Sequence, residues 1–123
     1  MRKTLLLALA LFVALPAIAS VKSEVYRQGT RLAAILQDAQ TNAAITDNSW
    51  KGIGREADSL ANGIMSDLAN TFRDQHKISI DVRQEVRAMR FAAGRDRNAE
   101  EARAHARQAL ASLTKLLEWS APR

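Results

Sequence analysis

The sequence lacks cysteine altogether, and it has only two prolines and two histidines among its 123 residues. Without a thiol the chain forms no disulfide, and it offers no cysteine nucleophile, no iron–sulfur cluster, no cysteine-ligated zinc and no covalently attached c-type haem. It also has no glycine-rich turn around a nucleophile, so no assembled catalytic site is recognisable. These residue types indicate a protein that works by binding or by structure and not an enzyme.

Long hydrophobic runs are scarce as well, because the only one spans residues 5–15. A positively charged start precedes this run, Pro16 ends it, and the small-x-small pattern of a signal-peptidase site ends at Ala19. The run is shorter than the roughly 20 residues that cross a bilayer. We therefore predict a signal peptide over residues 1–19, a single helical domain over residues 20–123 without a transmembrane segment, and a periplasmic or secreted location.

The net positive charge is small when the predicted signal peptide is not counted. Arg2 and Lys3 belong to the leader, so the net charge falls from +5 for the whole chain to +3 for the mature protein. A charge of this size does not by itself imply a polyanionic partner. Aromatic residues make up only 5% of the chain, and together with the export signal this argues against nucleic acid as a partner.

Apolar residues recur at helical spacing in four segments, which span residues 21–44, 48–74, 79–94 and 98–119. Each apolar stripe must be buried, because such a helix is not stable alone in water. Short polar connections favour antiparallel neighbours. We predict an all-α fold, a small irregular up-and-down four-helix bundle in which a long hairpin of the first two helices carries a shorter third and fourth helix. The clearest stripe, in the second segment, contains Trp50, Ile53, Ala57, Leu60, Ala61, Ile64, Leu68 and Phe72.

The helix ends have sequence signals of their own. Polar residues 46–49 predict a break before the second helix, and residues 75–77 predict the turn before the third. Gly94 is placed as a helix C-terminus requires. Asn98 and Glu101 have the spacing of a capping box at the start of the fourth helix.

Two bulky aromatics and one glycine bear on the ends of the core. We expect Trp50 to close one end of it and Trp119 to pack at an end as well. Gly54 lies on the apolar side of the second helix, where the absence of a side chain permits close packing.

The most specific polar feature is a line of arginines on the third helix, formed by Arg83, Arg87 and Arg90. Spaced four and three residues apart, they share one side of the helix with no acid one turn away on that line. Phe91 points away from the apolar stripe and adds a surface contact. This arginine line, with Phe91, is our candidate site for an anionic partner, such as an envelope protein or an anionic lipid surface. The alternative is structural: Asp58, Asp67 or Asp74 of the second helix pairs with these arginines, or the arginines are simply solvated.

Two further functions remain open. One is a haem-b or metal-binding four-helix carrier that uses Met65, Met89 or His105, although the sequence itself predicts no cofactor and no metal site. The other is a self-associating envelope structural protein in which Gly52 and Gly63 form a smooth strip on the second helix. No particular oligomeric state follows from the sequence.

Overall fold

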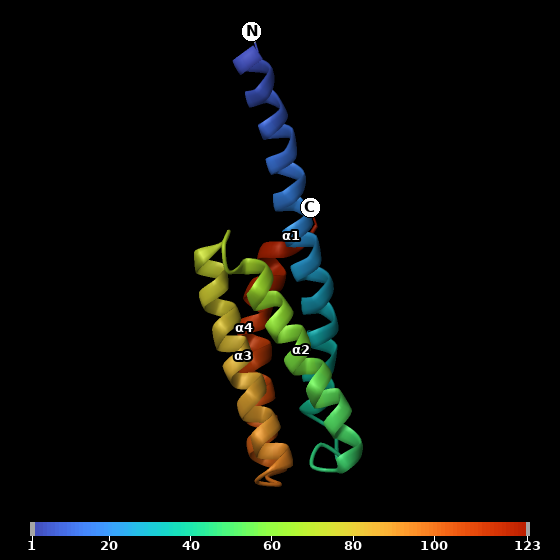
Figure 1. The fold of residues 1–123 in the computed structure, drawn as a ribbon. Coiled ribbons are helices and arrows are strands. Elements are labelled where there is room, and N and C mark those ends of the chain that lie inside the picture. The colour runs from blue at the N-terminus through green and yellow to red at the C-terminus, as the bar shows by residue number, and fades with distance from the viewer. Residues whose placement is uncertain (1, 123) are drawn as a thin grey trace.

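Four α-helices make up the fold in the computed structural model, which describes the backbone of residues 2–122 and the side chains of residues 18–122 (Figure 1). No strand occurs among these residues, and the predicted all-α class is confirmed. The elements in chain order are α1 (Arg2–Ala39), a single 3₁₀ turn η1 (Asn48–Trp50), α2 (Lys51–Leu68), α3 (Arg73–Gly94) and α4 (Ala99–Ser120).

The helices form a closed ring. Each packs on the next in chain order, and α4 returns to pack on α1. Successive helices run in opposite directions (Figure 1), so the predicted four-helix bundle is confirmed. One apolar core lies inside this ring, and its fully buried helical members are Val25, Leu32, Ile35, Leu36 and Ala39 of α1, Ala57, Ala61, Ile64 and Leu68 of α2, Val82, Val86, Met89, Ala92 and Ala93 of α3, and Ala102, Ala106, Ala109, Leu113 and Leu116 of α4.

The relative helix lengths differ from the prediction. The second helix ends at Leu68 and not at residue 74, and α3 begins at Arg73, so the predicted turn at residues 75–77 lies inside α3. With 18 residues α2 is shorter than α3 and α4, which have 22 each, and the predicted arrangement of a long hairpin carrying two shorter helices is wrong.

The difference arises at Phe72, which lies between α2 and α3 but still packs against the core. Phe72 has non-helical backbone angles just before α3, yet its ring meets that of Trp119 edge to face at 4.8 Å between centroids. The apolar spacing therefore continues across the real break, which falls at the poor helix formers Asn70 and Thr71. Asp74 then provides an acidic side chain in the first turn of α3, where the helix dipole favours it.

The first helix ends at Ala39, five residues before the predicted end. The side-chain oxygen of Asn42 accepts a hydrogen bond from the backbone N–H of Ala44 at 2.8 Å. This short-range bond offers the backbone an alternative to the helical pattern. Ala43, whose spacing continues the apolar stripe predicted over residues 21–44, is consequently exposed in the connection to α2.

Both signals at the α3–α4 connection are confirmed. α3 ends at Gly94, and the side chain of Asn98 accepts a hydrogen bond from the N–H of Glu101 at 3.1 Å, which caps α4. The connection between them is therefore short and fixed at both ends. This connection also forms one wall of a cleft at the same end of the bundle.

The predicted leader stays a prediction, because residues 1–17 lie outside those whose side chains are described. The N-terminal part of α1 extends beyond the other three helices (Figure 1). In the described part of the chain, none of the helices combines the length and apolar character needed to cross a membrane.

The contact between α3 and α4 relies on small side chains. Ala102, Ala106 and Ala109 are completely buried along α4. We expect Ala106→Leu to force extra volume into this contact and to lower the free energy of unfolding by about 1–3 kcal/mol. The matched change Ala111→Leu, at an exposed position of the same helix, should alter it by less than about 0.5 kcal/mol. Urea unfolding followed by circular dichroism measures both, and equal effects would contradict the assigned packing.

Candidate functional site

A cleft of about 530 Å³ opens at the end of the bundle where α2 begins and α3 ends. The connection between α1 and α2 and the connection between α3 and α4 reach the same end (Figure 1), and both contribute to its walls. We call this feature the basic cleft. Its charged lining residues are the cations Lys51, Arg55, Arg87, Arg90, Arg95 and Arg97 and the two acids Asp47 and Asp58.

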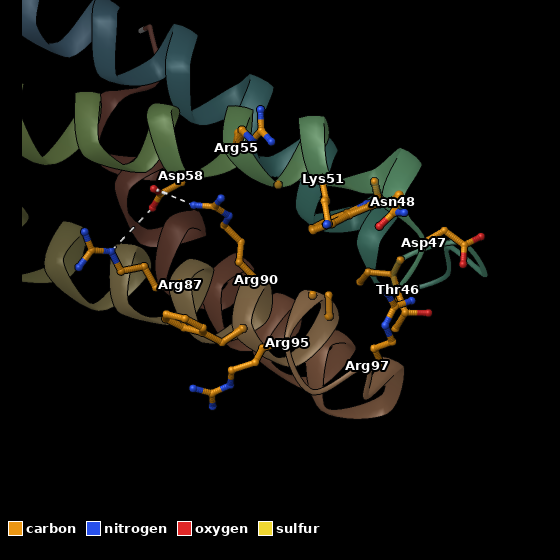
Figure 2. Close-up of a pocket in the computed structure, with 16 residues that line it drawn as sticks. Thr46, Asp47, Asn48, Lys51, Arg55, Asp58, Arg87, Arg90, Arg95 and Arg97 are labelled. Atoms are coloured by element: carbon orange, nitrogen blue, oxygen red, sulfur yellow. Dashed lines mark hydrogen bonds and ion pairs between the residues drawn. The ribbon is translucent and has the colours of Figure 1, made fainter.

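Asp58 is the acid around which two of the arginines gather. Nη1 of Arg90 donates a hydrogen bond to its Oδ2 at 3.1 Å, and Nε of Arg87 lies 3.9 Å from its Oδ1 (Figure 2). The Asp58 side chain is 19% exposed, so this pair of contacts lies partly out of solvent. The sequence-based alternative, in which Asp58 pairs with the arginine line, is therefore confirmed for Arg87 and Arg90.

Three cations of the lining have no such partner. Among the described side chains, Lys51, Arg55 and Arg97 form no ion pair. Lys51 and Arg55 come from the first turns of α2, while Arg97 comes from the connection after α3, so they approach the cleft from different elements (Figure 2). Like charges held at one concave surface raise the local positive potential. The cleft is therefore more basic than the whole chain.

Arg95 stands apart from the other cations. Its Nε donates a hydrogen bond to Oδ1 of Asp96 at 3.0 Å, and this bond raises the pKa of Arg95. In Figure 2 its side chain points away from the cleft, and its guanidinium lies 5.2 Å from the centroid of the Phe91 ring. Phe91 is 55% exposed, more than any other large apolar side chain described. A stacked arginine and an open aromatic ring thus lie together at the edge of the cleft.

Beneath the cations the lining is apolar. Ile45, Trp50 and Ala93 line the cleft although each is almost fully buried in the core. A Cβ atom on Gly54 would lie only 2.9 Å from the Trp50 ring, so the indole packs on the α2 backbone where a side chain is missing. This confirms the predicted places of Trp50 and Gly54. The indole N–H of Trp50 is buried and has no acceptor among the described residues.

The structure divides the predicted arginine line. Arg87, Arg90 and Phe91 line the basic cleft, whereas Arg83 does not. Arg83 lies one helical turn further from the cleft, is only half exposed, and has a buried Nε without a hydrogen-bond partner among the described residues. Sequence reasoning missed Lys51 and Arg55 as partners of this line. Their only signal was a basic side chain on the polar side of a helix, which does not identify the element that this side faces.

Residues proposed for the other functions lie elsewhere. Met89 is completely buried in the core and Met65 is half-buried on α2. Nδ1 of His105 lies 2.7 Å from a carboxylate oxygen of Glu85 on α3. None of these three residues lines the basic cleft.

The two glycines of the predicted association strip differ in their surroundings. A Cβ atom on Gly52 would meet nothing within 4 Å, whereas one on Gly63 would collide with the side-chain oxygen of Gln28 on α1. The end of the flexible Gln28 side chain therefore reaches over Gly63, while Gly63 itself stays half exposed. The self-association hypothesis stays a prediction.

Comparison of the chain with protein-family models, with curated proteins and with solved structures gave no match. The function must therefore be argued from the cleft itself.

Arg97 has a backbone conformation that glycine adopts more readily. Its φ of 49° lies in the left-handed region, in which it is the one non-glycine residue among those described. We expect Arg97→Gly to be about 1 kcal/mol more stable to unfolding than Arg97→Ala, because both remove the charge and only glycine removes the steric cost. Chemical unfolding of the two variants gives this difference. If the alanine variant equals or exceeds the glycine variant in stability, the left-handed conformation of this residue is refuted.

Proposed function

We propose that the protein is an exported helical binding module that recognises an anionic partner through the basic cleft. The observation that carries this proposal is that six cations and only two acids line one concave surface, with Arg95 alone among the cations pointing away from it. Export is supported by the charged start, apolar run and small-x-small site of residues 1–19. No catalytic group is part of the proposal.

The arrangement of the cations supports a binding site over a basic surface that is only solvated. A solvated basic face needs no particular geometry, but here α2, α3 and the connection after α3 each contribute cations to the same opening. Arg87 and Arg90 are also held in place by Asp58. A guanidinium that is already oriented loses less freedom when it binds a carboxylate or phosphate oxygen.

Asp58 is then a fixed counter-ion with two effects. It orients two arginines, and it reduces the positive charge that an incoming anion meets. Lys51, Arg55 and Arg97 have no acid to share, so they are the cations that contribute most to attraction of the partner. Binding should accordingly weaken as salt is added, since these side chains are exposed.

The test removes these three charges without removing the partners of Asp58. We expect the combined variant Lys51→Gln, Arg55→Gln and Arg97→Gln to keep its helical circular dichroism and to lose about tenfold or more in affinity for an anionic probe at low salt. The probes are pyrophosphate, a hexaglutamate peptide and phosphatidylglycerol vesicles, each titrated against the full chain. Phosphatidylcholine vesicles control for uncharged membrane binding.

A matched variant separates the basic cleft from net charge. Arg73→Gln, Lys77→Gln and Lys115→Gln remove the same number of charges at exposed positions outside the cleft lining. This variant should bind within about twofold of the unchanged protein, apart from the smaller screened effect of net charge. Equal losses in both variants, or the absence of binding to every anionic probe, would refute the proposed function.

A further inference from the structure

Phe91 is the large apolar side chain that the fold leaves most open to solvent. It is 55% exposed, and its backbone belongs to α3. Arg87 and Arg95 lie one helical turn before and after it, with side chains that are 50% and 72% exposed. The backbone N–H of Arg95 donates to the carbonyl oxygen of Phe91 at 3.0 Å, so the helical geometry continues to this residue. We call Arg87, Phe91 and Arg95 the aromatic edge.

Both arginines of the aromatic edge are oriented by an acid and still have free donors. Nε of Arg87 lies 3.9 Å from Asp58, and Nε of Arg95 donates a hydrogen bond to Asp96 at 3.0 Å. The guanidinium of Arg95 also lies 5.2 Å from the centroid of the Phe91 ring. Because an arginine has five N–H donors, each guanidinium retains donors for a second carboxylate. Side chains that are already oriented lose less freedom when a partner binds.

The shape of the aromatic edge favours a partner that is longer than a small molecule. Phe91 and Arg87 line the basic cleft, but the side chain of Arg95 points away from it (Figure 2). A small molecule buries most of its surface in a concave site, so a ligand confined to the cleft would miss the guanidinium of Arg95. A partner that contacts all three residues must leave the cleft and continue over the outer side of α3. A peptide segment has this length.

The exposed apolar surface is small, which favours a protein segment over a membrane. Binding to a membrane surface depends on several apolar side chains that enter the bilayer together. Among the described side chains, the other exposed large apolar ones are Ile18 and Tyr26, which belong to α1 and do not line the basic cleft. One aromatic ring between two arginines is instead typical of the anchor residues of protein interfaces.

The spacing of the aromatic edge defines the pattern of the partner. Arg87 and Arg95 are eight residues apart, which corresponds to about 12 Å along a helix at 1.5 Å per residue. In an extended peptide, alternate side chains share one face, and four residues span roughly 13 Å. Two acids four residues apart, with an apolar residue midway between them, therefore match the two arginines and Phe91.

Resting on the proposed function, we infer that the partner is an acidic protein segment that lies extended along α3, with an apolar side chain on Phe91 and one carboxylate at each arginine of the aromatic edge. Contact with the apolar side chain removes the exposed Phe91 ring from water and supplies affinity. Further acids of the same segment meet the cations of the basic cleft that form no ion pair, among them Lys51 and Arg97.

The test uses seven-residue serine peptides with blocked ends, titrated against the full chain at low salt and followed by amide NMR. The first peptide has glutamates at its second and sixth positions and leucine at its fourth. It should bind at least about fivefold more tightly than the same peptide with serine in place of leucine. A third peptide, with the two glutamates directly beside the leucine, should bind at least about threefold more weakly than the first, because neighbouring side chains of an extended peptide point to opposite faces.

Variants of the protein locate the contact. Phe91→Ser should lower the affinity for the leucine peptide to that of the serine peptide, and it should leave the affinity for the serine peptide within about twofold. Tyr26→Ser is the matched control, since Tyr26 is an exposed aromatic of α1 outside the basic cleft. Arg95→Gln should weaken binding of the leucine peptide severalfold, whereas Arg73→Gln, at an exposed position of α3 outside the cleft lining, should change it by less than about twofold.

The outcomes separate this inference from the proposed function. If the leucine and serine peptides bind equally while hexaglutamate still binds through the basic cleft, the inference is overturned and the proposed function stands. Equal binding of the third peptide also overturns it, because the partner would then not lie extended along α3. Binding to phosphatidylglycerol vesicles that is lost in Phe91→Ser, without discrimination among the peptides, would assign the aromatic edge to a membrane surface. If no anionic probe binds, both proposals fall.

Discussion

Burial of four apolar stripes inside a ring of antiparallel helices is the constraint on which the rest of the structure depends. Each stripe is stable only against its neighbours, and the short connections require consecutive helices to reverse direction. As a result the start of α2 and the end of α3 lie at the same end of the bundle (Figure 1). The basic cleft is a consequence of this topology, because residues from 45 to 97 meet there only when the core has formed.

The same end of the bundle carries features that do not favour stability. Several cations are held near one another, Arg97 has a left-handed backbone conformation, and the indole N–H of Trp50 is buried without an acceptor among the described residues. The backbone conformation of Arg97 and the unpaired indole N–H each cost on the order of 1 kcal/mol. Asp58 offsets part of the repulsion by its contacts with Arg87 and Arg90. Unfavourable features collected at a concave surface are the pattern expected where binding takes precedence over stability.

The sequence was sufficient to predict the four helices, but it was not sufficient to predict where each of them ends. Apolar spacing located all four helices, because burial selects one face of each. It failed at Phe72, which keeps its place in the spacing after the helix has ended, and at residues 75–77, which are polar but belong to the first two turns of α3 and not to a turn between helices. Glycine and asparagine gave better signals, since Gly94 and Asn98 have direct roles at the two helix ends.

For the candidate site, the sequence showed which side chains share a face of one helix. It did not show which helices face one another. The arginines of α3 were visible in the sequence, and Asp58 was one of several acids that had the right place to meet them. Lys51 and Arg55 joined them only when the pairing of α2 with α3 was known, and Arg83 was separated from them for the same reason.

The central claim is that anions bind at one end of this bundle and not over its whole basic surface. Backbone amide NMR spectra recorded during a titration with pyrophosphate test it most directly. The account predicts that the large chemical-shift changes fall within residues 45–58 and 87–97, with little change around Trp119 at the opposite end. Changes of similar size over all four helices, or changes centred on the opposite end, would contradict it.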